Sequence, residues 1–442
     1  MQNKNLLEKT LKMVEGENIG FIHLVFMDIL GFQKTIVLPS DRLERAVKEG
    51  VVFDGSSVVG YATIDESDMR LYPDLETFMV LPWYDEKHRT AQVICDIYDP
   101  KGQKFKGDPR HILRRTMERA EKKGWIFNTG PEYEFFLFKA GEKDTELEDR
   151  GGYFDLMPMD RAALVGKEIM HNLRNMGIEV ETGHHEVAPS QHEIDLKYSD
   201  AMTSADRVFV LKYAIKTLAL KNGMHATFMP KPLNDVNGSG MHVHQSLMTT
   251  KGENVFYDPD NKDGLSSTCM NYMAGTLEHA KEICGILASW PNSYKRLTPG
   301  FEAPVYVCWA KKNRSALVRV PDGRGSSTRL EMRCPDSAGN PYLQFAVLLA
   351  AGLDGIEKGL EPPQATERDV FKMSHDQREK MGIQSLPSNM GHAISLMEEN
   401  QLVRETLGEH VLEHLVHSKK KEWDLYRTTV SQWEKERYLH IL

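Results

Sequence analysis

The chain has 442 residues, of which 40% are hydrophobic and 27% are charged, so it can bury a large core and divide into two domains. A formal net charge of −9 argues against nucleic acid or a membrane surface as a partner held by the overall field, and it favours small-molecule partners. The five cysteines are scattered without a C-x-x-C pair, which disfavours a disulfide framework or a thiolate zinc site and predicts a reducing cytoplasm.

The first hundred residues alternate short apolar runs with turns that contain Gly, Pro and Asp. This pattern predicts strands with few helices between them. The predicted strands are Phe21–Phe26, Thr35–Leu38, Thr77–Leu81 and Ala91–Ile97. The charges within the first nine residues are not typical of a signal peptide. We therefore expect a small, strand-rich domain over residues 1–104.

A helix start follows this region at Asp108, which is an acidic N-cap with Pro109 at the first helical position. Amphipathic spacing continues from there to a closing glycine, Gly124. Other helices are predicted at about Asp160–Met176, Ser204–Asn222, Leu277–Ser289 and Pro341–Lys358. Apolar strand-like stretches separate them, so the domain over residues 105–442 mixes helices with a sheet.

Two apolar features lie toward the C-terminal end. The longest apolar stretch, Phe345–Leu353, is too short to span a bilayer and predicts a buried helix. The last twenty residues predict a helical tail that carries an aromatic stripe of Trp423, Tyr426, Trp433 and Tyr438. We expect this stripe to pack on the chain itself or on another subunit.

Polar residues stand two apart within three strand-like segments of the larger domain. The pairs are Glu132 and Glu134, His242 and His244, and Glu331 and Arg333. Because strand side chains alternate between faces, both members of each pair point the same way. Each pair alone is explained by a solvated strand face or by hydrogen-bonded core histidines. Together they are unexpected on a helix-covered sheet unless a cation compensates them.

Two more carboxylates, Glu186 and Glu193, lie seven residues apart with Pro189 between them, which predicts a loop followed by a strand. If they converge with the others, mutual repulsion requires divalent cations among them. Oxygen-rich ligation with at most one imidazole per ion suits Mg²⁺ or Mn²⁺ better than zinc.

A basic segment runs from Lys295 to Arg333, with nine Lys or Arg against three acids, a net charge of +6. Arginine forks bind phosphates and carboxylates, so an anionic substrate bound with Mg²⁺ is one interpretation, and a solvated surface is another. Few aromatic residues interleave with the charges, which disfavours nucleic acid. No G-x-x-x-x-G-K-[ST] motif is present, so a nucleotide would be held without a P-loop.

Seven ordered motifs covering nearly the whole chain resemble class I glutamine synthetases. They are Phe53-Asp-Gly-Ser-Ser57 continuing to Glu66-Ser-Asp-Met69, Gly130-Pro-Glu-Tyr-Glu-Phe-Phe136, His184-His-Glu-Val-Ala, Lys231-Pro with Asn237-Gly-Ser-Gly-Met-His-Val-His244, Asn292-Ser-Tyr-Lys-Arg-Leu, Asn313-Arg-Ser, and Glu331-Met-Arg333. The resemblance implies an α+β fold with a small N-terminal β-grasp domain. The large catalytic domain is then of the glutamine synthetase/guanido kinase type, and its curved antiparallel sheet forms half of an intersubunit barrel.

The same resemblance implies an ATP-dependent ligase that joins ammonia to the γ-carboxylate of L-glutamate through γ-glutamyl phosphate. The products are L-glutamine, ADP and phosphate. It also implies a cytoplasmic homo-oligomer, typically a dodecamer of two hexameric rings with active sites between subunits. Small regulatory proteins are further candidate partners, whereas nucleic acid and membranes are not expected.

Site residues are carried over motif by motif. The resemblance implies a first metal ion held by Glu134, Glu186 and Glu193, and a second held by Glu132, His242 and Glu331. Glutamate would contact Asn237, Gly238, Arg296, Glu302 and Arg333. ATP would contact Glu181, His244, Ser246, Arg314 and Arg319. The ammonium site would comprise Asp54, Ser57 and Tyr153.

Three of these residues are implied to be catalytic. Asp54, supplied by the adjacent subunit, would take the proton from ammonium. Glu302 would lie on a flap that closes over the intermediate and excludes water. Arg314 would stabilise the transferring phosphoryl group.

The sequence departs from the family pattern at two regulatory positions. Phe371 stands near the tyrosine that some members adenylylate, so we expect the subtype without adenylylation. Thr63 stands where other members place an arginine for glutamine feedback. Two alternatives remain open: a γ-glutamyl-amine ligase of the same fold, and a non-catalytic relative. Retention of Asp54, Tyr153 and Glu302 favours ammonium as the substrate.

Overall fold

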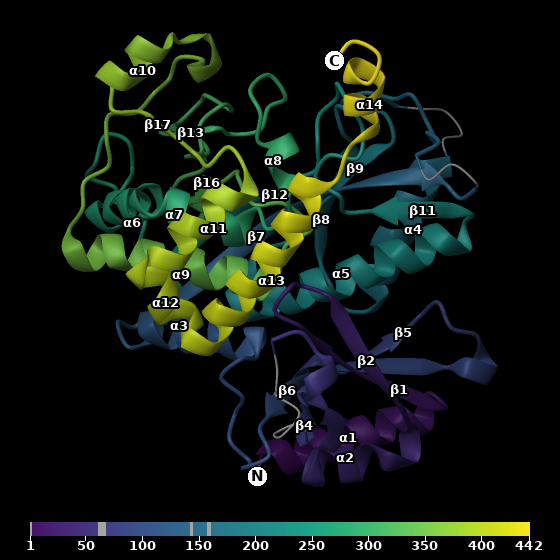
Figure 1. Ribbon diagram of the computed structural model, residues 1–442. Coiled ribbons are helices and arrows are strands. Elements are labelled where there is room, and N and C mark those ends of the chain that lie inside the picture. Colours follow the sequence, from purple (N-terminus) through teal and green to yellow (C-terminus); the bar gives the residue numbers. More distant parts are fainter. Residues whose placement is uncertain (1, 61–67, 142–144, 157–160) are drawn as a thin grey trace.

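The computed structural model describes residues 2–60, 68–141, 145–156 and 161–442, and it contains two large sheets, each with its own apolar core (Figure 1). Position Thr63 lies outside the described residues. The predicted division between residues 104 and 105 falls between the last strand of the first sheet and the helix that begins at Pro109. That boundary stays a prediction.

The first sheet has six strands in the order β2-β1-β6-β4-β3, with β5 also paired to β6. The strands are β1 (Phe21–Met27), β2 (Gln33–Pro39), β3 (Val51–Asp54), β4 (Asp68–Pro73), β5 (Met79–Leu81) and β6 (Thr90–Tyr98). The pairing of β1 with β6 is parallel, and the other pairings are antiparallel. Helices α1 (Gln2–Gly16) and α2 (Leu43–Glu49) lie on this sheet in Figure 1.

Sequence patterns located three of these strands well and misjudged the surroundings. The predicted strand Thr77–Leu81 is shorter in the structure, because Leu75–Thr77 form a 3₁₀ turn capped by the Asp74 side chain. Helix α1 was not predicted, since its first turns carry both lysines and leucines without a capping signal.

Helix α3 (Pro109–Glu121) begins as expected, with the Asp108 carboxylate accepting a hydrogen bond from the backbone N–H of Arg110 at 3.0 Å. The Arg110 side chain is buried and links the small-sheet region to the larger part of the chain. Its guanidinium contacts Asp74 at 2.8 Å, Asp96 on β6 at 2.6 Å and Asp206 at 2.8 Å. One arginine therefore neutralises carboxylates from both parts of the chain.

The second sheet has nine strands in the order β14-β15-β16-β12-β7-β9-β8, with β10 and β11 also paired to β7, and it curls into a half barrel. The strands are β7 (Trp125–Lys139), β8 (Val180–His185), β9 (Gln191–Leu196), β10 (Ser199–Asp200), β11 (Met224–Thr227), β12 (Met241–Thr249), β14 (Trp309–Ala310), β15 (Val318–Arg319) and β16 (Leu330–Met332). The expected antiparallel pattern holds except between β14 and β15, which are parallel. A separate pair joins β13 (Tyr306–Val307) to β17 (Gln384–Ser385).

Most predicted helices of the larger part are present. They are α4 (Arg161–Asn175), α5 (Ala201–Lys221) and α9 (Pro341–Lys358). The predicted helix Leu277–Ser289 is instead the end of α6 (Ser267–Glu278) followed by α7 (Ala280–Leu287). The break is at His279, whose Nε2 lies 2.7 Å from the Asp354 carboxylate. The remaining helices are α8 (Ser293–Arg296), α10 (His375–Lys380), α11 (Met390–Glu399), α12 (Gln401–Leu407), α13 (Glu409–Thr428) and α14 (Gln432–Tyr438).

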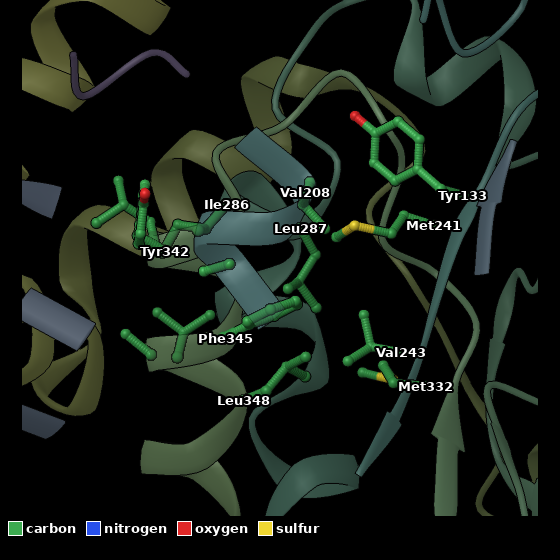
Figure 2. Close-up of a cluster of buried hydrophobic side chains, with 14 of the residues drawn as sticks. Tyr133, Val208, Met241, Val243, Ile286, Leu287, Met332, Tyr342, Phe345 and Leu348 are labelled. Atoms are coloured by element: carbon green, nitrogen blue, oxygen red, sulfur yellow. The ribbon is translucent and has the colours of Figure 1, made fainter. Parts of the chain in front are cut away.

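The main core lies between the large sheet and helices α5, α7 and α9 (Figure 2). Val208 on α5, Leu287 on α7 and Phe345 on α9 pack toward Met241 and Val243 on β12. Because strand side chains alternate, burying these two residues turns the residues between and beside them to the other face of the sheet. The other face of the sheet is therefore available for polar side chains.

The C-terminal tail is helical, as expected, but it forms two helices and not one. The capping box of Ser431 with Glu434 starts α14 after α13 has ended at Thr428. Trp423 packs against the main core, whereas the Trp433 side chain is 58% exposed. Among the described helices, none combines the length and apolarity needed to cross a bilayer.

Candidate active site

A cavity of about 540 Å³ lies on the polar face of the large sheet. Tyr133, Met241 and Met332 point into the core in Figure 2, and their strand neighbours line the cavity on the opposite face. All six carboxylates and imidazoles expected to hold metal ions line this one cavity: Glu132, Glu134, Glu186, Glu193, His242 and Glu331. The alternation signal in the sequence correctly indicated which side chains share a face.

Glu132 lies between two imidazoles. Its Oε2 is 2.9 Å from His242 Nδ1, and its Oε1 is 2.6 Å from His244 Nε2. The strand register creates this arrangement, because His242 on β12 is directly opposite Glu132 on β7. Burial would raise the pKa of Glu132, but the two histidine hydrogen bonds outweigh it and lower the pKa well below the usual range. The Glu132 carboxylate is thus favoured in its ionised form, with one histidine at each of its two oxygens.

Glu331 is fully buried and is held by two arginines from the basic segment. Arg319 Nε and Arg333 Nη1 each donate a hydrogen bond to one of its two carboxylate oxygens. Burial alone would raise the pKa of Glu331, but the charge of Arg333 and of nearby histidines lowers it to about 2. The cation that compensates this carboxylate in the structure is therefore supplied by the protein.

Among the described residues, no arginine or lysine pairs with the remaining three glutamates, although His184 nitrogens lie 3.7 Å from Glu186 and 3.2 Å from Glu193. The Glu134 carboxylate accepts hydrogen bonds from Gln191 Nε2 and from the Gly240 backbone, both at 2.9 Å. Burial, followed by the charge of Glu134, raises the pKa of Glu186 to about 8 and that of Glu193 to about 12. Adjacent carboxylates that cannot all ionise alone are a donor set that fits divalent cations.

Ligand atoms in the cavity come close enough to share an ion in two groups. Glu132, Glu193 and His242 offer atoms within 4.8 Å of one another, and so do His184, Glu193 and Asp195. The grouping differs from the two expected sets, because Glu193 belongs to both groups. Neither His184 nor Asp195 was predicted as a ligand, although Asp195 stands two residues after Glu193 on the same strand face. The alternation rule that singled out the other pairs would have found it.

The expected glutamate-binding residues also line the cavity, and two of them are linked. Asn237 Nδ2 donates a hydrogen bond to Glu302 Oε2 at 3.2 Å. Gly238 packs so closely that an added Cβ would lie 2.1 Å from the Pro230 carbonyl oxygen, so this position requires glycine. Glu302 itself has a positive φ of 56°.

The two expected carboxylate-binding arginines are already engaged. Arg296 is 3% exposed, and its guanidinium donates hydrogen bonds to the carbonyls of Arg333, Cys334 and Pro335 at 2.9–3.2 Å. Arg333 donates to Glu331. Both line the cavity, and Arg333 Nε has no hydrogen-bond partner among the described residues.

The three residues expected at the ammonium site do not lie together within one chain. Tyr153 lines the cavity, and its hydroxyl is a hydrogen-bond partner of Arg314. Asp54 ends β3 of the small sheet, Ser57 lies in the 3₁₀ turn that follows it, and neither lines this cavity. There the Asp54 carboxylate accepts hydrogen bonds from Ser56 N at 2.9 Å and Ser56 Oγ at 2.7 Å, which lowers its pKa.

A second cavity of about 260 Å³ adjoins the first, and Glu132 and Asp195 line both. Three of the expected ATP-binding residues, Glu181, His244 and Ser246, line this second cavity. The other two, Arg314 and Arg319, line the first cavity. Arg329 also lines the second cavity and donates a hydrogen bond to His244 Nδ1 at 3.1 Å, a contact that was not predicted.

Two family models match the chain in succession. The model "Glutamine synthetase, beta-Grasp domain" matches residues 18–100, and "Glutamine synthetase, catalytic domain" matches residues 106–438. The chain belongs to the glutamine synthetase family.

Relatives named glutamine synthetase match this family member along its whole length. The protein of Methanosarcina mazei is 48% identical over 98% of this chain and 98% of its own. That of Thermus thermophilus is 47% identical over 97% of this chain and 98% of its own. Among solved structures, one described as "GmaS/ADP complex-Conformation 1" has a TM-score of 0.88 with 30% identity, covering 97% of this chain and 99% of its own. The Plasmodium falciparum glutamine synthetase, at 24% identity and a TM-score of 0.87, shares the fold over 98% of both chains.

A further cluster of this glutamine synthetase family member lies beside the site. Asp149 Oδ1 is 2.8 Å from His185 Nε2, and the Nδ1 atom of the same ring is 2.6 Å from the Glu186 carbonyl oxygen. Asp149 Oδ2 is also 3.6 Å from His192 Nε2. The cluster therefore fixes the backbone of Glu186 from outside the cavity, and no sequence signal in the single chain pointed to Asp149.

Proposed function

We propose that this glutamine synthetase family member joins ammonia to the γ-carboxylate of L-glutamate with ATP, through γ-glutamyl phosphate, and releases L-glutamine, ADP and phosphate. One observation carries the proposal. The cavity that holds Glu134, Glu186 and Glu193, which pair with no arginine or lysine among the described residues, adjoins a second cavity lined by Glu181, His244 and Ser246, and the two cavities share Glu132. Together with full-length relatives named glutamine synthetase, this favours phosphoryl transfer over any chemistry without ATP.

The donor set supports Mg²⁺ or Mn²⁺ as the metal. Glu134, Glu186 and Glu193 would hold one ion, and Glu132, His242 and Glu331 would hold another. When bound, these ions would neutralise negative charge on the carboxylates and on the transferring phosphoryl group. Oxygen-dominated ligation with one histidine is the set expected for these hard cations.

The chain's own residues would then act on the substrates. Asn237, Gly238, Arg296 and Arg333 would orient glutamate so that a γ-carboxylate oxygen attacks the terminal phosphorus of ATP and ADP leaves. Arg314 and Arg319 lie in the same cavity to stabilise the charge of the phosphoryl group. Ammonia then attacks the acyl carbon and phosphate departs, while Glu302 shields the intermediate from water.

Ammonium must lose a proton before it can attack, and Asp54 would accept that proton. Asp54 and Ser57 stand outside the cavity of their own chain, whereas Tyr153 lines it. We infer that the small domain of a neighbouring subunit supplies Asp54 and Ser57, which requires an oligomer. A dodecamer of two hexameric rings in the cytoplasm is the assembly that we propose.

The test is glutamate-dependent phosphate release from ATP and Mg²⁺, with ammonium, hydroxylamine, methylamine or ethylamine supplied one at a time. We expect strong release with ammonium and glutamine as the product. Release with methylamine or ethylamine alone would instead assign the chain to γ-glutamyl-amine ligases. Size-exclusion chromatography with light scattering on the same sample checks the assembly, and an active monomer would contradict the shared site.

A further inference from the structure

A third cavity, also of about 540 Å³, lies away from the two cavities described above and shares no lining residue with either. Its walls come from the loop after β1, from α5, from the segment after β11, from the start of α8 and from α13. The segment ends in Pro230, whose carbonyl accepts a hydrogen bond from Ser239 N at 2.8 Å. The cavity is thus a separate space, lined by residues of the small N-terminal part and of the larger part of the chain.

The side chains that line this cavity carry a net positive charge. Three lysines line it, Lys212, Lys216 and Lys295, against one acid, Glu422, which gives a net charge of +2. Lys212 and Lys216 are one turn apart on α5, where like charges repel each other. Both ammonium groups lie near the Phe228 ring, at 5.5 and 5.7 Å from its centroid. Two cations are therefore directed to one wall of the cavity.

Lys212 is the residue that points to a ligand. Its side chain is more than nine-tenths buried, and among the described residues its ammonium makes no hydrogen bond or ion pair. Burial lowers the pKa of Lys212 to about 8, with the charge of Lys216 acting in the same direction. The buried Asp336 and Asp28 are close enough for their charges to act against this shift, but neither forms an ion pair with Lys212. A buried cation without a direct partner is costly, so a site that retains one beside an open space is suited to an anion.

The rest of the wall is aromatic. Phe32, Phe228, Trp290 and Tyr426 line the cavity, and the rings of Phe32 and Trp290 are in edge contact at 5.7 Å between centroids. Flat apolar surfaces with a few placed charges are typical of small-molecule sites. The occupant would present a negative group to the lysines and an apolar, ring-like body to these side chains.

We propose that this cavity is a second ligand site, which binds a small organic anion composed of a carboxylate or phosphate attached to an aromatic or apolar body. Lys212 and Lys216 bind the anionic group, and the ring lies among Phe32, Phe228 and Trp290. The ligand is separate from the substrates of the proposed reaction. Its binding is measured without turnover, so the proposal stands or falls independently of the proposed function.

The experiment is calorimetric titration of the intact protein with glutamate, ADP and Mg²⁺ already saturating. Phenyl phosphate carries both recognition features, inorganic phosphate lacks the ring, and benzyl alcohol lacks the charge. We expect phenyl phosphate to bind at least about tenfold more tightly than either partial probe. Lys212→Met should weaken that binding by about ten- to a hundredfold, because it removes a buried charge-assisted contact.

Two further variants guard the interpretation. Lys221→Met removes the same charge from the same helix outside the cavity, where the Lys221 ammonium donates to the Trp83 carbonyl at 2.7 Å, and it should leave phenyl phosphate binding unchanged. Lys216→Met alters an exposed residue and tests the site again if Lys212→Met does not fold. Lys212→Met should also raise the melting temperature in the absence of anion. Absence of phenyl phosphate binding, or equal binding by wild type and Lys212→Met, would overturn the proposal.

Discussion

The molecule has two clusters of buried and partly buried carboxylates, and their negative charge is compensated in different ways. Asp74, Asp96 and Asp206 surround Arg110 at 2.6–2.8 Å. Burial would raise the pKa of Asp96, but the charges of Arg110 and Arg114 lower it. In the catalytic cavity, by contrast, burial and mutual repulsion raise the pKa values of Glu186 and Glu193.

The difference separates a structural cluster from a ligand-binding one. Where the chain supplies its own cation, the charges are satisfied upon folding, and the cluster holds two parts of the chain together. Where no arginine or lysine of the described residues pairs with the carboxylates, as at Glu186 and Glu193, folding retains an electrostatic cost that an added cation can relieve. Glu331 lies between these extremes, because two arginines hold it inside the catalytic cavity.

The largest effect is expected from Arg110→Met. The substitution leaves the buried Asp206 without its arginine and removes one of two arginines from the partly exposed Asp74 and Asp96. Breaking a buried pair costs about 3–5 kcal/mol, and because Arg114 and solvent still compensate two of the three acids we expect a loss of about 3 kcal/mol. Unfolding in urea, followed by circular dichroism, measures this loss of stability.

Arg114→Met is the matched control for that measurement. Arg114 also contacts Asp96, at 2.7 Å, but its side chain is 26% exposed. We expect a loss of about 1 kcal/mol or less, since solvent screens the charges it leaves behind. Equal losses for the two variants would mean that Arg110 is not the shared cation that distinguishes this cluster.

The second prediction concerns Glu193→Gln in the other cluster. Burial raises the pKa of Glu193 to about 12, so the metal-free protein carries a neutral acid there, and the amide should leave its melting temperature nearly unchanged. Added Mg²⁺ or Mn²⁺ should raise the melting temperature of the wild type, and the variant should bind the ion at least about tenfold more weakly. Thermal unfolding across a metal titration checks both parts.

Glu179→Gln serves as the control, because Glu179 is an exposed residue that pairs with Lys197 at 2.6 Å. It should respond to metal as the wild type does. If Glu193→Gln bound the ion as tightly as the wild type, the catalytic cluster would not be the cation site, and the contrast between the two clusters would lose its functional meaning.

Much of this arrangement could be predicted from periodicity. Strand alternation correctly placed Glu132, Glu134, His242 and Glu331 on one face, and the signals at Asp108 and Pro109 located the start of α3. These features depend on neighbours two to four residues apart, which a sequence displays directly.

Contacts between side chains that are distant in the sequence could not be predicted from periodicity. The contact of Arg110 with Asp206, the arginine clamp on Glu331 and the link from Asp149 to His185 join positions whose partners depend on tertiary packing. Likewise, His279 at the break within the helix predicted at Leu277–Ser289 contacts Asp354, a residue far along the chain. The basic segment of the sequence indicates that positive charges neutralise acidic groups, but it does not identify the carboxylate that each arginine contacts.

The third prediction concerns Asp108, a buried acid that belongs to neither of the two carboxylate clusters. Asp108 is buried near Arg110, yet burial, followed by the charge of Asp96, raises its pKa to about 7, although the hydrogen bond from the Arg110 backbone N–H and the Arg110 charge act in the opposite direction. Between about pH 4 and 7 the folded state then holds a proton that the unfolded chain has lost, so stability falls as pH rises. The slope approaches about 1.4 kcal/mol per pH unit for one proton.

Asp108→Asn removes this titration and keeps an oxygen for the cap. The difference in unfolding free energy between wild type and variant should therefore shift toward the variant as pH rises from 4 to 7, and level off above 7. Urea unfolding at four pH values provides the measurement. A constant difference across that range would show that Asp108 is ionised in the fold and balanced by Arg110 after all.

The smallest effect tests how the catalytic cluster is coupled to substrate. Asn237 Nδ2 donates to Glu302 Oε2 at 3.2 Å, an exposed contact that contributes little to stability. Asn237→Ala should leave the melting temperature unchanged and raise the KM for glutamate about two- to tenfold, the loss expected for one or two hydrogen bonds. Steady-state rates at varied glutamate, compared with Asn261→Ala on a distant turn, separate substrate binding from folding. A fall in kcat with unchanged KM would instead assign Asn237 to holding Glu302 in place during turnover, and this outcome would extend the catalytic cluster beyond the sheet to the loop that carries Glu302.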